Sequence, residues 1–553
     1  MREDLIQLLQ EALQRYQAVG SNPMPLQAAV ILTVPKNEAY GDYATNLALS
    51  LAKDLKQSPM KIAEELLAYL PSPVTWLEKV EVVRPGFINF FLTDQAFQSV
   101  LPAIIKAARR YGEASWGAGE RIQIEFVSAN PTGPLHVGHG RGAALGEALT
   151  NLLRSTGHTV ETEYYLNDLG TQMETLGRSI QARFRELKGE DLPFPEDGYQ
   201  GDYIREIAAD LQKRIRQGSL SEEALDLSFF SRYGRETILA GIREDLQNFG
   251  ILFDHWFSEE SLVQQGLVQD LIKKMKSKAL FYDQEGALWF KSSAFGDDKD
   301  RVVVRSNGAL TYFATDIAYH HQKFGRGFQR LIDIWGADHH GYLPRLKAAL
   351  GSLGYEPDRL RVVLVQLVNL LRQGKPVAMS TRAGEFVTLR EVLEEVGKDA
   401  ARFIFLTRRS DSPLDFDLDL AKKQSNENPV YYVQYAHARV CSVLALARSQ
   451  GIDPAGFKGG SLSRLTLPEE KRLCKTLAEY PEEVTQAAAR LEPHRLPFYL
   501  TELAAQFHYY YNHHRFLTED RDLTEARLML VQSIGIVINN ALTLLGVEAP
   551  EKM

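Results

Sequence analysis

Two histidines three positions apart, His136 and His139, stand where a predicted strand gives way to a predicted helix. The strand is expected at residues 122–127, which run mostly apolar, and leucines recur at helical spacing behind the histidines. The first turn of a helix offers free backbone N–H groups and the positive end of the helix dipole, so it stabilises an anion. Both imidazoles can donate hydrogen bonds to phosphate oxygens, and Gly138 leaves room for a flat base against the backbone. This junction predicts an ATP site.

A second pair of side chains predicts a cation site. Tyr312 and Asp316 are four positions apart and therefore share one face if their segment is helical. A carboxylate can bind the planar guanidinium group by accepting two parallel hydrogen bonds from it. The alternative for these residue types is an aspartate solvated on a helix face and a tyrosine packed in the core.

The elements that position these residues alternate between strand and helix. Apolar runs at residues 160–166, 331–335 and 361–369 follow the first strand, and helical patterns separate them. This order predicts a parallel doubly wound, Rossmann-like sheet whose ligands bind beyond the carboxyl ends of the strands. Long charged helices and hairpin-like pieces at about 175–300 predict an insertion between the two halves of the sheet.

Three domains are therefore expected. They are a mixed α/β N-terminal domain at residues 1–115, an α/β domain with the insertion at 116–420, and an all-α C-terminal bundle at 421–553. Pro429 suits the first turn of a helix in the bundle. Its helices mix aromatic and basic residues as single-stranded RNA binding requires, although aromatic stripes are usually core.

Composition limits the class of protein. The 553 residues are 44% hydrophobic and 24% charged, as in an ordinary multidomain globular protein. A net charge of −8 argues against indiscriminate coating of nucleic acid, so any RNA contact should be local. Cys441 and Cys474 are too few for a disulfide framework or a four-thiolate zinc site. The acidic N-terminus is unlike a signal peptide, and we expect a cytoplasmic monomer with no membrane partner.

Longer phrases carry a family resemblance. Residues 128–139, Ser-Ala-Asn-Pro-Thr-Gly-Pro-Leu-His-Val-Gly-His, resemble the HIGH signature of class I aminoacyl-tRNA synthetases in its arginyl-tRNA synthetase version, of bacterial type. Residues 35–49 and 84–91 resemble the additional N-terminal domain of that family, which contacts tRNA. Residues 428–439 and 545–553 resemble its anticodon-binding domain and C-terminus. The resemblance spans the chain and implies a class I synthetase fold.

The resemblance also implies a reaction. An arginine-tRNA ligase activates L-arginine with ATP to arginyl-adenylate in a step that requires bound tRNA. It then transfers arginine to the 3′-terminal adenosine of tRNA-Arg, through the 2′-hydroxyl, and releases AMP and pyrophosphate. ATP is a substrate that brings Mg²⁺, and no metal site in the protein itself is expected.

By resemblance, Glu125 and Asn130 would bind the amino and carboxylate ends of arginine, Tyr312 and Asp316 its guanidinium, and Glu260 would be a second acid. Beside ATP, Asp338 and His340 would contact ribose hydroxyls. The neighbouring His339 and His340 diverge and lack a third ligand, so no zinc site is predicted. The expected tRNA contacts are Asn37, Tyr40, Tyr435, His437, Arg439, Tyr509 and Arg515.

The second class I signature, Lys-Met-Ser-Lys-Ser, is degraded. Met379 and Ser380 align with it, but Ala378 and Thr381 stand where the family pattern has lysines. Gly133 occupies the place of a lysine that compensates in some relatives. The growing charge on pyrophosphate still needs cations, and Lys375 and Arg382 are the nearest basic residues.

Two other functions remain open at this point. A tRNA-binding relative without catalytic activity would explain the degraded signature and would bind tRNA without forming an adenylate. A class I synthetase for another amino acid, such as cysteine, fits less well because no four-ligand Cys/His zinc constellation is present.

Overall fold

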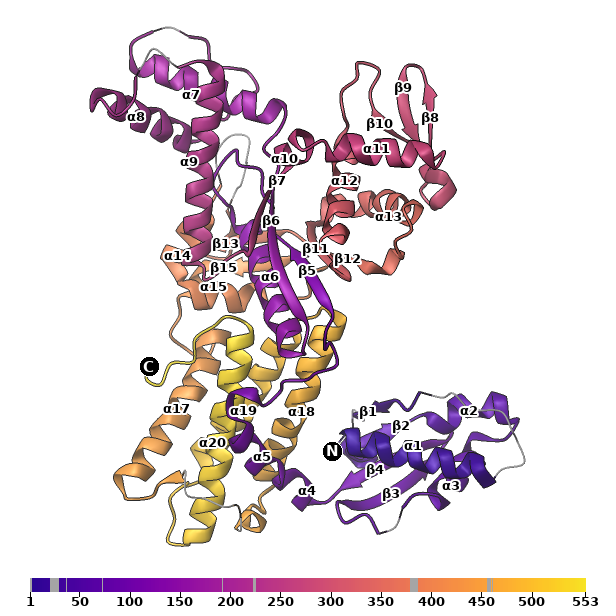
Figure 1. Ribbon diagram of the computed structural model, residues 1–553. Helices are drawn as coiled ribbons and strands as arrows, with labels where there is room; N and C mark the ends of the chain where they lie inside the picture. The colour runs from indigo at the N-terminus through magenta and orange to yellow at the C-terminus, as the bar shows by residue number, and fades with distance from the viewer. Residues whose placement is uncertain are drawn as a thin grey trace. The chain divides into compact units, whose positions relative to one another are not determined.

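The computed structural model describes residues 2–19, 29–35, 37–71, 73–190, 192–221, 225–377, 386–454, 459 and 461–553, except the side chains of Val19 and Glu38. The chain forms two compact units (Figure 1). Unit 1 comprises Met1–Arg109, Val440–Glu479 and Gln506–Val537, and unit 2 comprises Arg110–Arg439, Tyr480–Ala505 and Ile538–Met553. Helices of the C-terminal region contribute to both units, and domain boundaries after residues 115 and 420 stay predictions.

Unit 1 begins with an antiparallel sheet of strand order β1-β2-β4-β3, on which helices pack. Leu5, Leu9, Ala12 and Leu13 recur at helical spacing and are buried, so they form the core-facing stripe of α1. The strands are Leu32–Thr33 (β1), Tyr43–Thr45 (β2), Leu77–Val83 (β3) and Phe87–Leu92 (β4). The helices are Arg2–Val19 (α1), Leu47–Leu55 (α2), Pro59–Ala68 (α3), Asp94–Gln98 (α4) and Val100–Ala107 (α5).

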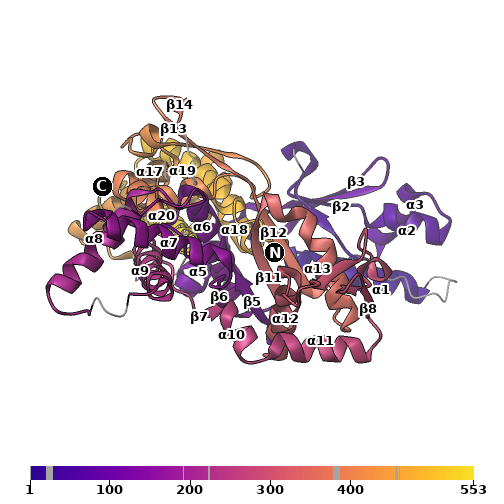
Figure 2. The same ribbon diagram turned by 90° about the horizontal axis from the view of Figure 1, so that it is seen from above.

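Unit 2 contains a five-stranded sheet of order β12-β11-β5-β6-β7, in which every neighbouring pair is parallel. This confirms the predicted Rossmann-like sheet. Its strands are Arg121–Glu125 (β5), Thr159–Leu166 (β6), His255–Ser258 (β7), Arg330–Gly336 (β11) and Leu360–Val365 (β12). Helix α6 (Val137–Ser155) contacts β5, β6 and β11, and α12 (Tyr312–Gly325) and α13 (Leu343–Ser352) lie beside β11 and β12 (Figures 1 and 2).

Helices and a small sheet fill the segments on either side of β7. Between β6 and β7 lie α7 (Thr171–Leu187), α8 (Asp202–Arg216) and α9 (Leu227–Asn248). After β7 come α10 (Glu259–Gln264), α11 (Leu267–Ser277) and an antiparallel sheet of Phe281–Gln284 (β8), Ala287–Phe290 (β9) and Arg301–Val304 (β10). The hairpin β8–β9 lies in the segment at about 175–300 for which hairpin-like pieces are predicted, and its turn at Glu285 and Gly286 has positive φ at both residues.

The predicted strand at 361–369 is wrong as a single element. The chain leaves the parallel sheet after β12, and β13 (Val368–Arg372) joins a different sheet of order β14-β13-β15. At the break, the Gln366 N–H donates to the Ser410 carbonyl at 2.8 Å. The apolar run continues through this bend, so periodicity along the sequence could not reveal it. The other strands are Lys375–Pro376 (β14) and Leu414–Asp417 (β15).

The C-terminal region is helical, as predicted. The helices of the predicted bundle are Pro429–Ser449 (α17), Pro468–Arg490 (α18), Arg495–His513 (α19) and Arg521–Leu544 (α20). Before them lie Leu389–Val396 (α14), Lys398–Phe405 (α15) and Leu418–Ala421 (α16), on either side of β15. Helix α17 begins at Pro429 because the fixed φ of proline suits a first turn. Helix α20 is long and apolar enough to cross a membrane, but 72% of its apolar window is buried inside the structure, as in a core helix.

Candidate active site

The two histidines cap helix α6. His136 is its N-cap residue, and His136 Nδ1 accepts a hydrogen bond from the Gly138 backbone N–H at 3.0 Å. His139 Nδ1 accepts from the His136 backbone N–H at 3.2 Å, so each ring satisfies one of the orphan donors of the first turn. The rings stack with centroids 3.7 Å apart. Since both Nδ1 atoms accept, each neutral ring carries its proton on Nε2.

The protonation of these rings follows from their surroundings. Burial lowers the pKa of His136, and burial together with the neighbouring His136 lowers the pKa of His139 to about 3. Both rings are therefore neutral at pH 7 and present Nε2–H as a hydrogen-bond donor without adding a full charge. Electrostatic attraction for an anion comes instead from the helix dipole.

A cavity of about 740 Å³ opens beside this helix start. It lies beyond the carboxyl ends of β5, β11 and β12, where a doubly wound sheet binds its ligands. The predicted residues that line it are Asn130, His136, Gly138, His139 and Asp338. His340 is not among the lining residues, whereas its neighbour His339 is. Both belong to a short 3₁₀ helix at Ala337–Tyr342, whose tight turn points adjacent side chains apart.

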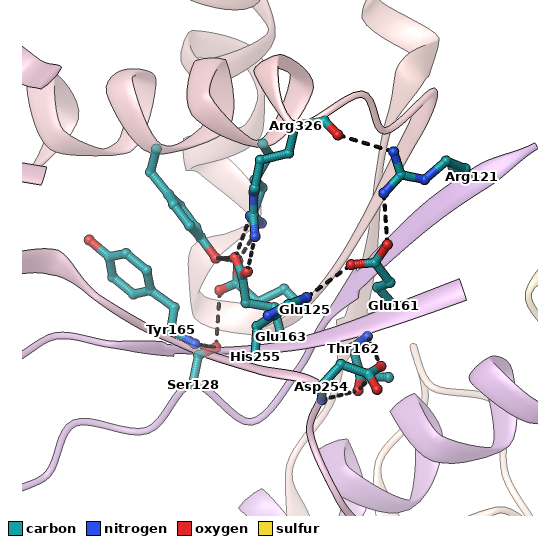
Figure 3. A network of polar contacts seen from close by, with 12 residues as sticks. Arg121, Glu125, Ser128, Glu161, Thr162, Glu163, Tyr165, Asp254, His255 and Arg326 are labelled. Carbon is teal, nitrogen blue, oxygen red and sulfur yellow. Dashed lines mark hydrogen bonds and ion pairs between the residues drawn. The ribbon is translucent and has the colours of Figure 1, made fainter. Parts of the chain in front are cut away.

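A buried charge network lies beneath this end of the sheet (Figure 3). The Lys323 ammonium is fully buried and contacts Glu125 at 2.5 Å and Asp333 at 3.1 Å. Burial alone would lower the pKa of Lys323, but its carboxylate partners outweigh burial and raise it. Burial likewise opposes the ionised form of Asp333, yet Lys323 and His320 hold the pKa of Asp333 at about 2.

The carboxylate of Glu125 therefore has a cationic partner, Lys323, inside the protein. Its Oε2 accepts from Lys323 and from the Tyr319 hydroxyl at 2.8 Å, and its Oε1 accepts from the Ser128 hydroxyl at 3.0 Å. Farther back in the network, Arg326 donates two hydrogen bonds to Glu163, at 2.6 and 2.9 Å (Figure 3). Only the Oε1 side of Glu125 lies away from its buried cation.

Two other carboxylates, Asp316 and Glu259, form no ion pair with a lysine or arginine among the described residues, whereas Asp168 beside them lies 3.7 Å from the Arg235 guanidinium. Asp316 accepts a hydrogen bond from the Tyr342 hydroxyl, and burial raises the pKa of Asp316 to about 6. Glu259 is 3% exposed, and among the described residues its buried Oε2 has no hydrogen-bond partner. Burial raises the pKa of Glu259, and the nearby charges of Asp316 and Asp168 raise it further. A ligand cation would relieve this repulsion, and the carboxylates of Asp316 and Glu259 can accept from the donors of a guanidinium.

The loop after β6 positions this cluster. Asp168 accepts from the Ser258 hydroxyl at 2.7 Å and from the Glu260 backbone N–H at 3.0 Å, so it caps α10 and fixes the register of Glu259. Tyr312, the first residue of α12, is 57% exposed, and its hydroxyl lies near Gly170 in the same loop.

The sequence did not single out Glu259 or Asp168. It predicted Glu260, whose carboxylate is 3.3 Å from the Arg235 guanidinium and also accepts from Gln264. Two adjacent glutamates in one short helix give no sequence signal for which side chain turns inward.

The remaining predicted residues are dispersed. Lys375 is exposed in β14, and Met379, Ser380 and Arg382 lie outside the described residues. Asn130 donates through Nδ2 to the Gln172 side chain at 2.9 Å.

The expected RNA contacts fall in both units. In unit 1, Asn37 and Arg515 are exposed, as are Tyr40 (51%) and Tyr509 (53%). In unit 2, the Arg439 guanidinium lies 4.5 Å from the ring centroid of Tyr435. His437 is buried and its Nδ1 contacts the Pro550 carbonyl at 2.9 Å, so its ring holds the C-terminal segment and is not presented to an RNA.

Comparison with known proteins gives consistent matches over the chain. Family models match as "Arginyl tRNA synthetase N terminal domain" at residues 3–92, "tRNA synthetases class I (R), catalytic domain" at 100–411 and "DALR anticodon binding domain" at 433–553. The arginine–tRNA ligase of Citrifermentans bemidjiense is 52% identical over 100% of both chains. That of Desulfosudis oleivorans is 56% identical over 94% of both chains. The Thermus thermophilus arginyl-tRNA synthetase structure is 26% identical with a TM-score of 0.78, covering 100% of both chains.

Proposed function

The chain belongs to the arginyl-tRNA synthetase family, and from this premise we propose that it is an arginine–tRNA ligase acting on arginine, ATP and tRNA. The arginine carboxylate attacks the α-phosphate of ATP and forms arginyl-adenylate and pyrophosphate. A terminal ribose hydroxyl of tRNA-Arg then attacks the adenylate carbonyl, and AMP leaves. No side chain forms a covalent intermediate, so positioning and charge stabilisation supply the rate.

The cavity of about 740 Å³ is the proposed ATP site. His136 and His139 would donate from Nε2–H to phosphate oxygens, and the N-terminus of α6 would attract the triphosphate. Gly138 would let the adenine approach the backbone, and Asp338 would accept from ribose hydroxyls. Mg²⁺ enters as part of the nucleotide substrate. Among the described residues, no group of three or more His, Cys, Asp or Glu is placed to hold a metal ion.

The observation that carries the proposal is the pair of carboxylates Asp316 and Glu259, neither of which forms an ion pair with a lysine or arginine among the described residues. Asp316 and Glu259 would bind the arginine guanidinium, with the Tyr312 hydroxyl beside them, while Asp168 holds the helix that orients Glu259. A substrate without a cation would leave the repulsion between the carboxylates in place, which selects for a cationic amino acid, and the planar guanidinium of arginine can in addition donate to both carboxylates at once.

The backbone of arginine needs separate partners. The Oε1 side of Glu125 is proposed to face the α-ammonium, because Lys323 already donates to Oε2. Asn130 lines the nucleotide cavity and is proposed to orient the reacting carboxylate.

The remaining assignments concern pyrophosphate and tRNA. Lys375 and Arg382 are proposed to supply the cationic help that the degraded second signature lacks. Unit 1 would contact tRNA through Asn37, Tyr40 and Tyr509. The further proposed contacts are Arg515, Tyr435 and Arg439. As a soluble translation enzyme, the protein is proposed to act as a monomer in the cytoplasm.

An exchange assay tests the proposed reaction. The full-length protein is incubated with ATP, arginine and radiolabelled pyrophosphate, with and without a tRNA-Arg transcript, and lysine replaces arginine as the control. Label should enter ATP only with arginine, and only when tRNA is present. Folded protein that binds tRNA but exchanges no pyrophosphate under either condition would show a binding protein without ligase activity.

A further inference from the structure

A second charged cavity lies in unit 2, apart from the ATP cavity. It measures about 360 Å³, and its lining includes five arginines, Arg141, Arg361, Arg408, Arg409 and Arg490, which we name the arginine groove. We propose that the arginine groove binds the ribose–phosphate backbone of tRNA. This inference rests on the proposed function, because it takes tRNA as the partner.

The charges in the groove are unbalanced. Its two acids, Asp411 and Glu492, both lie beside Arg409. Asp411 accepts two hydrogen bonds from the Arg409 guanidinium at 3.1 and 2.9 Å, and a carboxylate oxygen of Glu492 lies 3.8 Å from the same guanidinium. By contrast, within the described ranges the exposed side chains of Arg361, Arg408 and Arg490 make no hydrogen bond or ion pair. Three guanidiniums that share one groove and are paired with neither of its acids attract an anion.

The floor of the groove adds a further cation. Arg141 is 2% exposed and donates to the Gln366 carbonyl at 2.9 Å and the Arg409 carbonyl at 2.8 Å. Burial lowers the pKa of Arg141 to about 10, so the side chain stays charged at neutral pH. Main-chain carbonyls orient this guanidinium, but none of its hydrogen bonds goes to a carboxylate.

The arginines stand on fixed elements. Arg361 belongs to the edge strand β12, Arg408 follows α15 within three residues, and Arg490 ends α18. These elements fix the backbone positions of the three arginines, so their exposed side chains all start from the rim of one groove.

Phosphodiester groups fit such a groove best. The planar fork of arginine matches two phosphate oxygens at once, and successive phosphates of a nucleic acid can meet successive guanidiniums. Because the chain has a net charge of −8, most of its surface does not attract a polyanion, and a local group of unpaired cations is the place where one would bind. His494 also lines the groove, and burial lowers its pKa, so its neutral ring can serve as a hydrogen-bond partner for a ribose hydroxyl.

The test replaces the three unpaired arginines in the full-length protein. The variant Arg361→Gln/Arg408→Gln/Arg490→Gln removes charge without reversing it, and single replacements provide the intermediate steps. Affinity for a fluorescent tRNA-Arg transcript is measured between about 50 and 200 mM salt. Each lost phosphate contact should reduce the salt dependence over this range by about threefold. The KM for tRNA in aminoacylation should rise, while the KM values for arginine and ATP stay unchanged.

Two comparisons complete the test. Arg305→Gln removes another exposed arginine, in the loop after β10, and should leave tRNA affinity and its salt dependence unaltered. Binding of inorganic tripolyphosphate is measured for each variant as well. If tRNA affinity is unchanged and only tripolyphosphate binding is lost, the groove holds free phosphates and the assignment to RNA is wrong. Unchanged binding of both ligands would also overturn it. Failure of the proposed function looks different, because the unsubstituted protein would then charge no tRNA.

Discussion

Replacing Asp316 with asparagine should have opposite effects on stability and on arginine use. Burial raises the pKa of Asp316 from 3.8 to about 6, which means that folding disfavours the ionised carboxylate. The difference of about two pKa units corresponds to about 3 kcal/mol at 1.36 kcal/mol per unit. The amide side chain introduced by Asp316→Asn would keep an oxygen for the Tyr342 hydroxyl and lose only the charge.

The sign depends on pH. Well below the unfolded-state pKa of 3.8 the carboxyl is protonated in both the folded and unfolded states, so the substitution changes little. As pH rises from 3.8 to about 6, the unfolded state releases its proton first, and the native protein loses stability relative to the variant. At pH 7.5 Asp316→Asn should therefore raise the free energy of unfolding by up to about 3 kcal/mol.

Arginine use should fall in the same variant. Loss of a charge-assisted, two-point contact with the guanidinium costs about 3 kcal/mol, or about a hundredfold in kcat/KM for arginine, with little change in the KM for ATP. Urea unfolding at pH 4 and 7.5, together with pyrophosphate exchange at varied arginine and ATP, measures both effects.

The matched control is Asp333→Asn. Asp333 is paired with Lys323 and His320, and its pKa is held at about 2, so this replacement should destabilise the protein at neutral pH. The reasoning about Asp316 is refuted if Asp316→Asn behaves as Asp333→Asn does in unfolding, or if kcat/KM for arginine is unchanged.

Three further predictions follow from the site. Glu259→Gln should raise the KM for arginine at least tenfold, whereas Glu260→Gln should change it less than threefold; equal effects in exchange kinetics would contradict the inward orientation of Glu259. His139→Asn should lower kcat of pyrophosphate exchange by about a hundredfold. Because burial lowers the pKa of His139 to about 3, this ring should stay neutral between pH 6 and 8 in the native protein, and an NMR signal assigned to His139 that titrates in this range would disprove it. Lys323→Met should cost about 3 to 5 kcal/mol in urea unfolding, because it leaves two buried carboxylates without their cation, and a loss below about 1 kcal/mol would show that the network relaxes.

Features that depend on one element could be read from the sequence. The strand-to-helix junction at His136, the helical pair Tyr312 and Asp316, and the helix start at Pro429 follow from spacing, because neighbours on one helix or strand have fixed relative positions. The alternation of strands and helices also determined the parallel sheet, since only crossover connections join its strands. The family phrases then identified the chemistry.

Tertiary structure decided what lies across from each of these residues. Glu125 meets Lys323 from a distance of 198 positions in the sequence, which leaves only one of its oxygens for a substrate. Asp168 caps a helix that begins 91 positions later and so turns Glu259, not Glu260, toward Asp316. The apolar run at 361–369 divides between two sheets, because Gln366 is held by the carbonyl of Ser410. Spacing specifies which residues share an element, but burial, ionisation and hydrogen-bond partners depend on contacts that form only when distant segments pack together.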